Sequence, residues 1–178
     1  MCKIPGWQEI KPGRTKMAEI KAESVDPIRF AGAPLARNQH FCAFFHNRDE
    51  EYRVLLPFIR DGFERGERAF HVVDPKLRVD HLERLEAGGI RVKETQQTGQ
   101  LDVRNWEDST LLDGHFDQHR MLGLIDHVLA EGKSGAFAVT RWVGYMEWAL
   151  EDRPGLNDFV EFETRINHIL SKYPDPVI

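Results

Sequence analysis

Three side chains near the start of the first apolar segment are of types that bind transition metals. His40, Cys42 and His46 alternate along what would be one face of a strand and its exit, and imidazole and thiolate groups are common zinc ligands. His115 and His119 have the i, i+4 spacing that places two imidazoles on one face of a helix. Neither set is a complete metal-binding signature. The sequence therefore favours core or surface histidines at these positions and predicts no metal and no cofactor.

A second cluster of chemically capable residues lies between positions 140 and 150. The segment leaves an expected buried strand and brings Arg141, Trp142, Tyr145, Glu147 and Trp148 close to the carboxyl end of that strand. Pockets form at this end of the strands in parallel sheets, and aromatic rings with a few polar groups suit a small molecule. The alternative is that the aromatic residues pack a helix start against the sheet while Arg141 and Glu147 form an ion pair.

Glu163 lies within the inward-facing stripe of the last expected helix. A buried carboxylate needs a partner, because an unpaired charge is costly to remove from water. Arg141 is the candidate partner, so the sequence predicts that these two side chains meet.

The turn after the first expected strand, residues 45–51, is unsuited to phosphate binding. It has no glycine to let the backbone approach a phosphate and no lysine, and Asp49, Glu50 and Glu51 crowd the helix start where the anion would bind. The Gly-Lys-Ser at 132–134 follows a helix, and position 127 is His where a phosphate loop needs Gly. Nucleotide hydrolysis is therefore disfavoured.

Nucleophilic catalysis has no support from spacing. Cys42 lies inside an expected strand rather than at a helix start, and Ser109 and Ser134 have no glycine elbow around them. Because no acid, base and nucleophile set emerges, the sequence predicts a protein that is not an enzyme.

The elements that would position these residues alternate between strand and helix. A helix follows the acidic run at 49–51 and ends at Gly66, with a kink or a restart expected at Pro57, and another begins at Pro75 behind the capping residue Asp74. This alternation predicts an α/β fold in three layers, with a mainly parallel sheet and helices on both faces. The expected strands are residues 40–45, 69–73, 90–92, 101–105 and 136–141, and the later helices are residues 116–131 and 158–172.

Length and charge limit the class of protein. The chain has 178 residues, 24 Lys and Arg against 29 Asp and Glu, and two cysteines. The net charge of −5 offers no broad basic surface, so no direct contact with nucleic acid is expected. The few cysteines fit a reducing cytoplasm, and the apolar runs are too short to cross a membrane.

The chain divides unequally. Residues 1–39 have no sustained apolar period and are expected to be a partly flexible arm, and residues 40–178 form the domain. Val177 and Ile178 have the pattern of the first half of a buried strand, so the sequence leaves open that this strand is truncated.

Seven short strings stand in the following order along the chain: residues 40–45, 56–58, 66–69, 71–75, 99–101, 146–150 and 162–163. Taken together, they resemble the MEDS domain, the methanogen/methylotroph sensory domain. The resemblance implies a degenerate RecA-like fold that lacks the nucleotide loop, and a role in sensing small organic ligands, including hydrocarbon derivatives. It also implies that His40, Arg141, Glu147, Trp148 and Glu163 belong to the pocket.

The leading hypothesis is a cytoplasmic, non-catalytic sensory domain that binds a small organic ligand and signals to a partner such as a histidine kinase or an anti-sigma-factor antagonist. A homodimer is left open. The alternatives are a degenerate RecA-like nucleotide-binding ATPase and a pure protein-interaction module. The expected ligand-binding residues are His40, Cys42, His46, Arg141, Trp142, Glu147, Trp148 and Glu163.

Overall fold

A three-stranded parallel sheet forms the centre of the computed structural model, which describes residues 26–35 and 40–178. Strand β3 (Arg68–Val73) lies between β4 (Leu101–Asn105) and β5 (Thr140–Gly144) and is parallel to both. Ala69 is in register with Leu101 on one side and Arg141 on the other. The unbroken apolar run of β3 is typical of a strand covered on both faces. The predicted α/β class with a mainly parallel sheet is thus confirmed.

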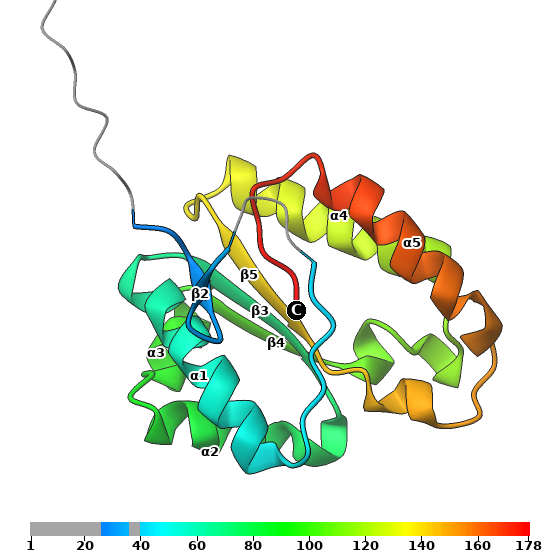
Figure 1. Cartoon of the computed structure of the whole chain (residues 1–178), viewed down its shortest axis with the longest axis horizontal. Coiled ribbons are helices and arrows are strands. Elements are labelled where there is room, and N and C mark those ends of the chain that lie inside the picture. Colours follow the sequence, from blue (N-terminus) through cyan, green and yellow to red (C-terminus); the bar gives the residue numbers. More distant parts are fainter. Residues whose placement is uncertain (1–25, 36–39) are drawn as a thin grey trace, which may run out of the picture.

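The helices lie on both sides of this sheet (Figure 1). Helices α1 (Arg48–Glu64), α2 (Arg78–Ala87) and α3 (Val92–Gln97) are on one side, and α4 (Gln118–Ser134) and α5 (Phe159–Leu170) are on the other. Within the described residues no helix combines the length and the hydropathy needed to cross a membrane. Short 3-10 helices complete the connections: η1 (Pro75–Leu77), η2 (Trp106–Asp108), η3 (Leu112–Gly114), η4 (Glu147–Leu150) and η5 (Leu156–Asp158).

The strand side chains divide the interior into two hydrophobic clusters. Phe70 and Val72 of β3 belong to the cluster under α4 and α5, whereas Ala69 and Val73 belong to the cluster under α1 and α2. This division follows from the two-residue period of a strand, which sends successive side chains to opposite faces.

A β-hairpin precedes the domain and packs on α1. Strands β1 (Arg29–Phe30) and β2 (Ala33–Pro34) are antiparallel and are joined by Ala31 and Gly32, which both have positive φ. The ring of Phe30 meets that of Phe58 on α1 edge-on, with centroids 5.8 Å apart. The hairpin is the described part of the expected arm, and residues 1–25 and 36–39 lie outside the described residues.

The last residues of the described chain extend the sheet beyond β5. Trp142 donates its N–H to Pro176 O at 3.1 Å, and Gly144 donates to Ile178 O at 2.7 Å. On the far side, Phe41 donates its N–H to Val177 O at 2.9 Å. Residues 176–178 therefore lie between β5 and the backbone of His40 and Phe41, and Val177 makes parallel bridges in both directions.

The expected strand at residues 40–45 is wrong beyond its first residues. Only His40 makes a bridge, and the chain then leaves the sheet to reach the start of α1, which leaves Phe44 93% exposed. A strand forms only as far as a neighbouring strand is available for pairing. Here the neighbour is the short segment at 176–178, so the apolar run pairs only at its start.

Three other boundaries differ from expectation. Ile90 and Val92 are buried without forming a strand, because α3 begins at Val92 directly after the turn at Gly89. Strand β5 begins at Thr140, so Arg141 is its second residue rather than its exit. Helix α1 is continuous and does not restart at Pro57, since Leu55, Phe58 and Ile59 hold this turn in the core.

Candidate functional site

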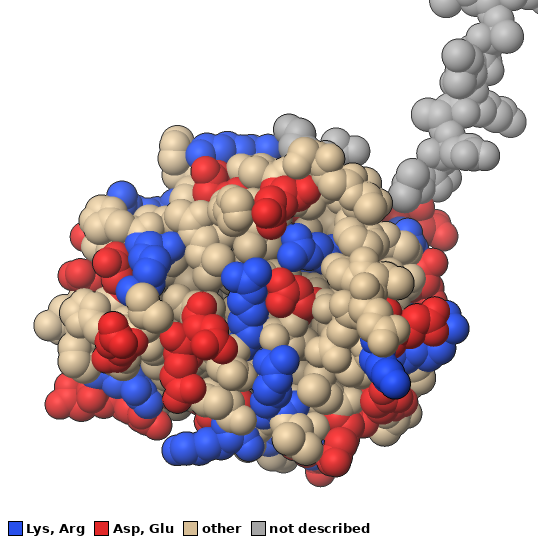
Figure 2. Space-filling model, turned by 180° about the vertical axis from the view of Figure 1, so that it is seen from behind, with Lys and Arg blue, Asp and Glu red and all other residues tan. Residues whose placement is uncertain are grey.

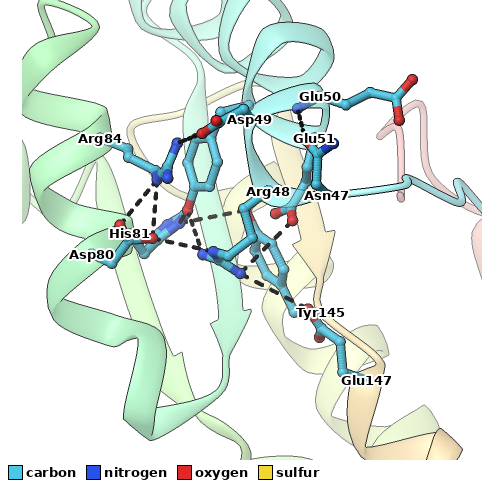
Figure 3. A network of polar contacts seen from close by, with 11 residues as sticks. Asn47, Arg48, Asp49, Glu50, Glu51, Asp80, His81, Arg84, Tyr145 and Glu147 are labelled. Atoms are coloured by element: carbon cyan, nitrogen blue, oxygen red, sulfur yellow. Dashed lines mark hydrogen bonds and ion pairs between the residues drawn. The ribbon is translucent and has the colours of Figure 1, made fainter.

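The carboxyl ends of β3 and β5 meet the start of α1, and a polar network occupies this place (Figure 3). Asn47 caps α1, its side-chain oxygen accepting the Glu50 N–H at 2.9 Å. The predicted acidic first turn, Asp49 to Glu51, is present. The capping side chain accepts a hydrogen bond from a free N–H group of the first turn, and the carboxylates interact favourably with the positive end of the helix dipole. The turn is therefore stable without a bound anion.

Arg48 lies at the centre of the network. Its Nε donates to Asp80 Oδ2 at 3.2 Å and its Nη2 donates to the Tyr52 hydroxyl at 3.3 Å. Its Nη1 lies 3.8 Å from a Glu51 oxygen and 4.0 Å from a Glu147 oxygen. One guanidinium, about a quarter exposed, thus joins the first turn of α1, helix α2 and the segment after β5.

A chain of buried hydrogen bonds leads inward from Arg48. His81 Nδ1 lies 2.5 Å from the Tyr52 hydroxyl and 3.4 Å from the Tyr145 hydroxyl, and His81 Nε2 lies 2.9 Å from His71 Nδ1. Burial lowers the pKa of His71 to about 3 and, together with the neighbouring His71, lowers that of His81 to about 2. Burial also raises the pKa of Tyr52 to about 12. These side chains are therefore neutral at physiological pH.

Like His71, whose buried Nε2 has no hydrogen-bond partner among the described residues, Glu51 leaves one atom of the network unsatisfied. Its side chain is buried, and its Oε1 has no hydrogen-bond partner within the described part of the chain. Burial raises the pKa of this carboxyl group, and the charge of Glu147 adds to the effect, whereas the charge of Arg48 and a hydrogen bond between Tyr145 and this carboxylate partly oppose it. An unsatisfied buried acceptor costs about 1–3 kcal/mol. A molecule that donates a hydrogen bond at this position would recover that free energy.

Three of the expected site residues meet at a second place. His40 Nε2 lies 3.6 Å from Glu163 Oε2, and Cys42 donates its S–H to the same oxygen at 3.6 Å. His40 and Cys42 come from the segment that borders residues 176–178, and Glu163 comes from α5.

Arg141 lies far from its expected partners. Its guanidinium is buried beneath α1, where it donates to Glu67 Oε2 at 2.5 Å, to Asp61 Oδ2 at 2.6 Å and to the carbonyl of Phe58. The expected pairings with Glu163 and with Glu147 are therefore wrong. The reason is the late start of β5, which places Arg141 near the amino end of the strand.

The remaining expected site residues divide between the core and the network. Trp142 stacks on Phe70 with ring centroids 4.3 Å apart, and Trp148 packs against Phe116 at 5.0 Å, so both belong to the interior. Glu147 lies in the network beside Arg48. His46 is exposed and pairs with Glu50 at 2.8 Å.

Most of the network was not anticipated from the sequence. The network is built from two helices: α1 supplies Arg48 and Tyr52, and α2 supplies Asp80 and His81. No local sequence pattern predicts how these two helices are placed relative to each other. One signal was available: His71 interrupts the apolar run 69–73, and a buried imidazole needs a polar partner.

Two hollows lie elsewhere on the surface. One of about 770 Å³ lies between the hairpin and α1, and one of about 430 Å³ lies between α4 and α5, with His119, Asp126 and Arg165 in its wall. On the face seen in Figure 2, basic and acidic side chains are interspersed, without a broad patch of one sign.

Comparison with known proteins finds one family. The family model described as MEDS, methanogen/methylotroph, DcmR sensory domain, matches residues 39–177. No curated protein and no solved structure matches this chain.

Proposed function

Since this chain belongs to the MEDS family of sensory domains, we propose that it is a non-catalytic sensor that binds a small organic molecule at the carboxyl-end face of its sheet. The observation that carries the proposal is the buried Oε1 of Glu51, which has no hydrogen-bond partner among residues 26–35 and 40–178, beside the partly exposed guanidinium of Arg48. In parallel sheets this is the usual place for a ligand.

The charges of the network indicate what kind of molecule would bind. Four carboxylates, from Asp49, Glu51, Asp80 and Glu147, surround the two guanidinium groups of Arg48 and Arg84. An anion would be repelled, whereas a small alcohol or amine can donate to Glu51 Oε1. We infer that the ligand is a small, uncharged or cationic molecule with an O–H or N–H group.

The same network offers a route for the signal. It joins the first turn of α1, helix α2 and the segment after β5 through side chains of Arg48, Asp80 and Glu147 (Figure 3). A ligand that enters between Arg48 and Glu147 would shift these elements relative to one another. A partner such as a histidine kinase or an anti-sigma-factor antagonist would read that change, and the ligand must bind the two arrangements differently for the signal to pass.

A thermal-shift screen tests the proposal. Small alcohols, amines, carboxylates and halogenated hydrocarbons are each added to the full chain, and we expect alcohols or amines to raise the Tm while carboxylates do not. Glu51→Gln and Arg48→Met should abolish the shift, and Arg53→Met, whose side chain is 75% exposed one turn further along α1, should retain it. Equal shifts in wild type and Glu51→Gln would place the ligand elsewhere, and no shift with any compound would count against ligand sensing.

We further propose that the arrangement of helices on both sides of the parallel sheet is a degenerate RecA-like fold that has lost its nucleotide site. The support is the first turn of α1, where Asp49, Glu50 and Glu51 stand in place of glycines and a lysine. Calorimetric titration with Mg-ATP should give no binding heat. Saturable heat that is lost in Glu147→Gln would instead favour the ATPase alternative.

A further inference from the structure

We propose that His40, Cys42 and Glu163 form a binding site for a divalent transition-metal ion, with Zn²⁺ as the best match. The three side chains offer one imidazole nitrogen, one sulfur and one carboxylate oxygen, and these atoms all lie within 4.8 Å of one another. The proposal is independent of the ligand site at Arg48 and Glu51, because it rests on a different set of residues.

The distances suit a shared ion. Tetrahedral zinc bonds of about 2.0–2.3 Å place neighbouring ligand atoms about 3.3–3.8 Å apart. His40 Nε2 and Cys42 Sγ are each 3.6 Å from Glu163 Oε2. The separation of His40 from Glu163 exceeds the 2.7–3.2 Å of a direct hydrogen bond between nitrogen and oxygen. An ion between them would give each atom a bond of ordinary length after a small adjustment.

The site is built on anchored segments. His40 and Cys42 alternate along an extended stretch, so they share one side of it, whereas Phe41 between them contacts the ring of Phe30 on the other side. The N–H of Phe41 is bonded to Val177 O, which fixes this stretch to the sheet. Glu163 follows Phe162, whose side chain is buried in the core under α5.

The mixture of donors indicates the class of metal. A thiolate with an imidazole is the ligand set of zinc and its neighbours, whereas Ca²⁺ and Mg²⁺ take oxygen ligands. Burial and the adjacent Glu163 raise the pKa of the Cys42 thiol, so metal binding would displace a proton from sulfur. Three protein ligands leave a fourth position, which water or a small polar molecule would fill.

Cobalt titration of the full, chelator-treated chain tests the site directly. We expect one Co²⁺ per chain, with a near-ultraviolet thiolate-to-cobalt absorption band that Zn²⁺ removes by competition. Cys42→Ser should abolish the band, and Glu163→Gln or His40→Gln should weaken binding at least about tenfold. Matched controls are Cys2→Ser, His46→Gln and Glu161→Gln, the last on the same helix, and they should leave the titration unchanged. A cobalt spectrum without the thiolate band, or one that persists in Cys42→Ser, would overturn the proposal.

A second measurement needs no variant and therefore no assumption about folding. Alkylation of the two cysteines of the wild-type chain is followed by mass spectrometry with and without Zn²⁺. We expect Zn²⁺ to slow modification of Cys42 at least about tenfold and to leave that of Cys2 unchanged. Equal rates at Cys42 with and without the metal would exclude the site.

Discussion

Among the described residues, His71 and His81 are histidines whose side chains are almost completely buried. His71 and His81 are hydrogen-bonded to each other, and Tyr52, Tyr145 and Arg48 surround the outer one. Two imidazoles in direct contact cannot both carry a charge inside a core without a large cost. The network is therefore compatible only with neutral histidines.

This requirement predicts that the protein loses stability in mild acid. In the unfolded chain both histidines take up a proton near pH 6.5, whereas the folded pKa values are about 3 for His71 and about 2 for His81. The stabilisation is thus complete above pH 6.5 and is lost as the pH falls toward 3. Urea unfolding should show a free energy of unfolding lower by about 2–3 kcal/mol at pH 5.5 than at pH 7.5.

The slope of the free energy of unfolding against pH shows how much the buried histidines contribute, compared with other titratable groups. His81→Gln removes one of the two protons, so the loss between pH 7.5 and 5.5 should fall to about half whatever the stability of the variant at neutral pH. His127→Gln, at an exposed site on α4, should keep the wild-type slope. An unchanged slope in His81→Gln would show that His81 takes up its proton equally in the folded and the unfolded state, and would contradict the lowered pKa.

Among the contacts between elements, Arg141 of β5 links helix α1 to the sheet through ion pairs. Arg141 reaches from β5 under α1 to Asp61 and Glu67, and its side chain lies against Gly62. A Cβ atom at position 62 would stand 2.8 Å from the arginine side chain, so the close approach of the helix depends on this glycine.

Arg141→Met should destabilise the protein by about 2–4 kcal/mol in urea unfolding. The methionine keeps the packing of the aliphatic stem, but Asp61 and Glu67 lose their common cation, and Glu67 is largely buried. The double variant Arg141→Met/Glu67→Gln should regain part of the loss. Arg60→Met, an exposed position of the same helix, should change stability by less than about 0.5 kcal/mol, and a similar effect at both positions would refute the anchoring role.

Local sequence patterns correctly predicted those elements whose formation depends only on residues adjacent in the sequence. The apolar run of β3, the cap of Asp74 before Pro75 and the acidic start of α1 all depend on adjacent residues, and the structure confirms them. The expected strand at 40–45 failed because its length depends on a partner at 176–178, which is distant in sequence.

The site was predictable only in part for the same reason. Glu147 and the acidic turn were expected at the carboxyl-end face, and His40, Cys42 and Glu163 do meet, although not around Arg141. The misplacement of Arg141 follows from a strand boundary that is wrong by a few residues. Because β5 is short, an error of this size moves Arg141 from the expected carboxyl end of the strand to its amino end.

The hairpin is attached to the rest of the molecule by ring contacts of Phe30 and by hydrogen bonds from Arg65 to the residues that precede β1. Phe30 touches the rings of Phe58 and Phe41, and Arg65 donates to the carbonyl of Asp26 at 2.6 Å. The hairpin is not hydrogen-bonded to the parallel sheet within the described residues. It should therefore be able to open without unfolding the domain.

Hydrogen exchange should detect that opening in Phe30→Ala. The amide of Leu35, which donates to Ile28 O at 2.7 Å, should exchange at least about tenfold faster, while the amides of β3 should be unaffected. Phe44→Ala, at a 93% exposed position, should change neither. An equal acceleration in β3 would mean that the hairpin and the domain unfold as one unit.

The position of residues 176–178 has a consequence for synthesis on the ribosome. His40 and Phe41 are among the first described residues to be made, yet their backbone neighbour Val177 emerges after every helix of the structure. The nascent chain must carry the backbone of His40 and Phe41 unpaired until Val177 has been made. This edge of the sheet thus cannot close before Val177 has been made, and until then the nascent protein is open to chaperones and to mispairing at this edge.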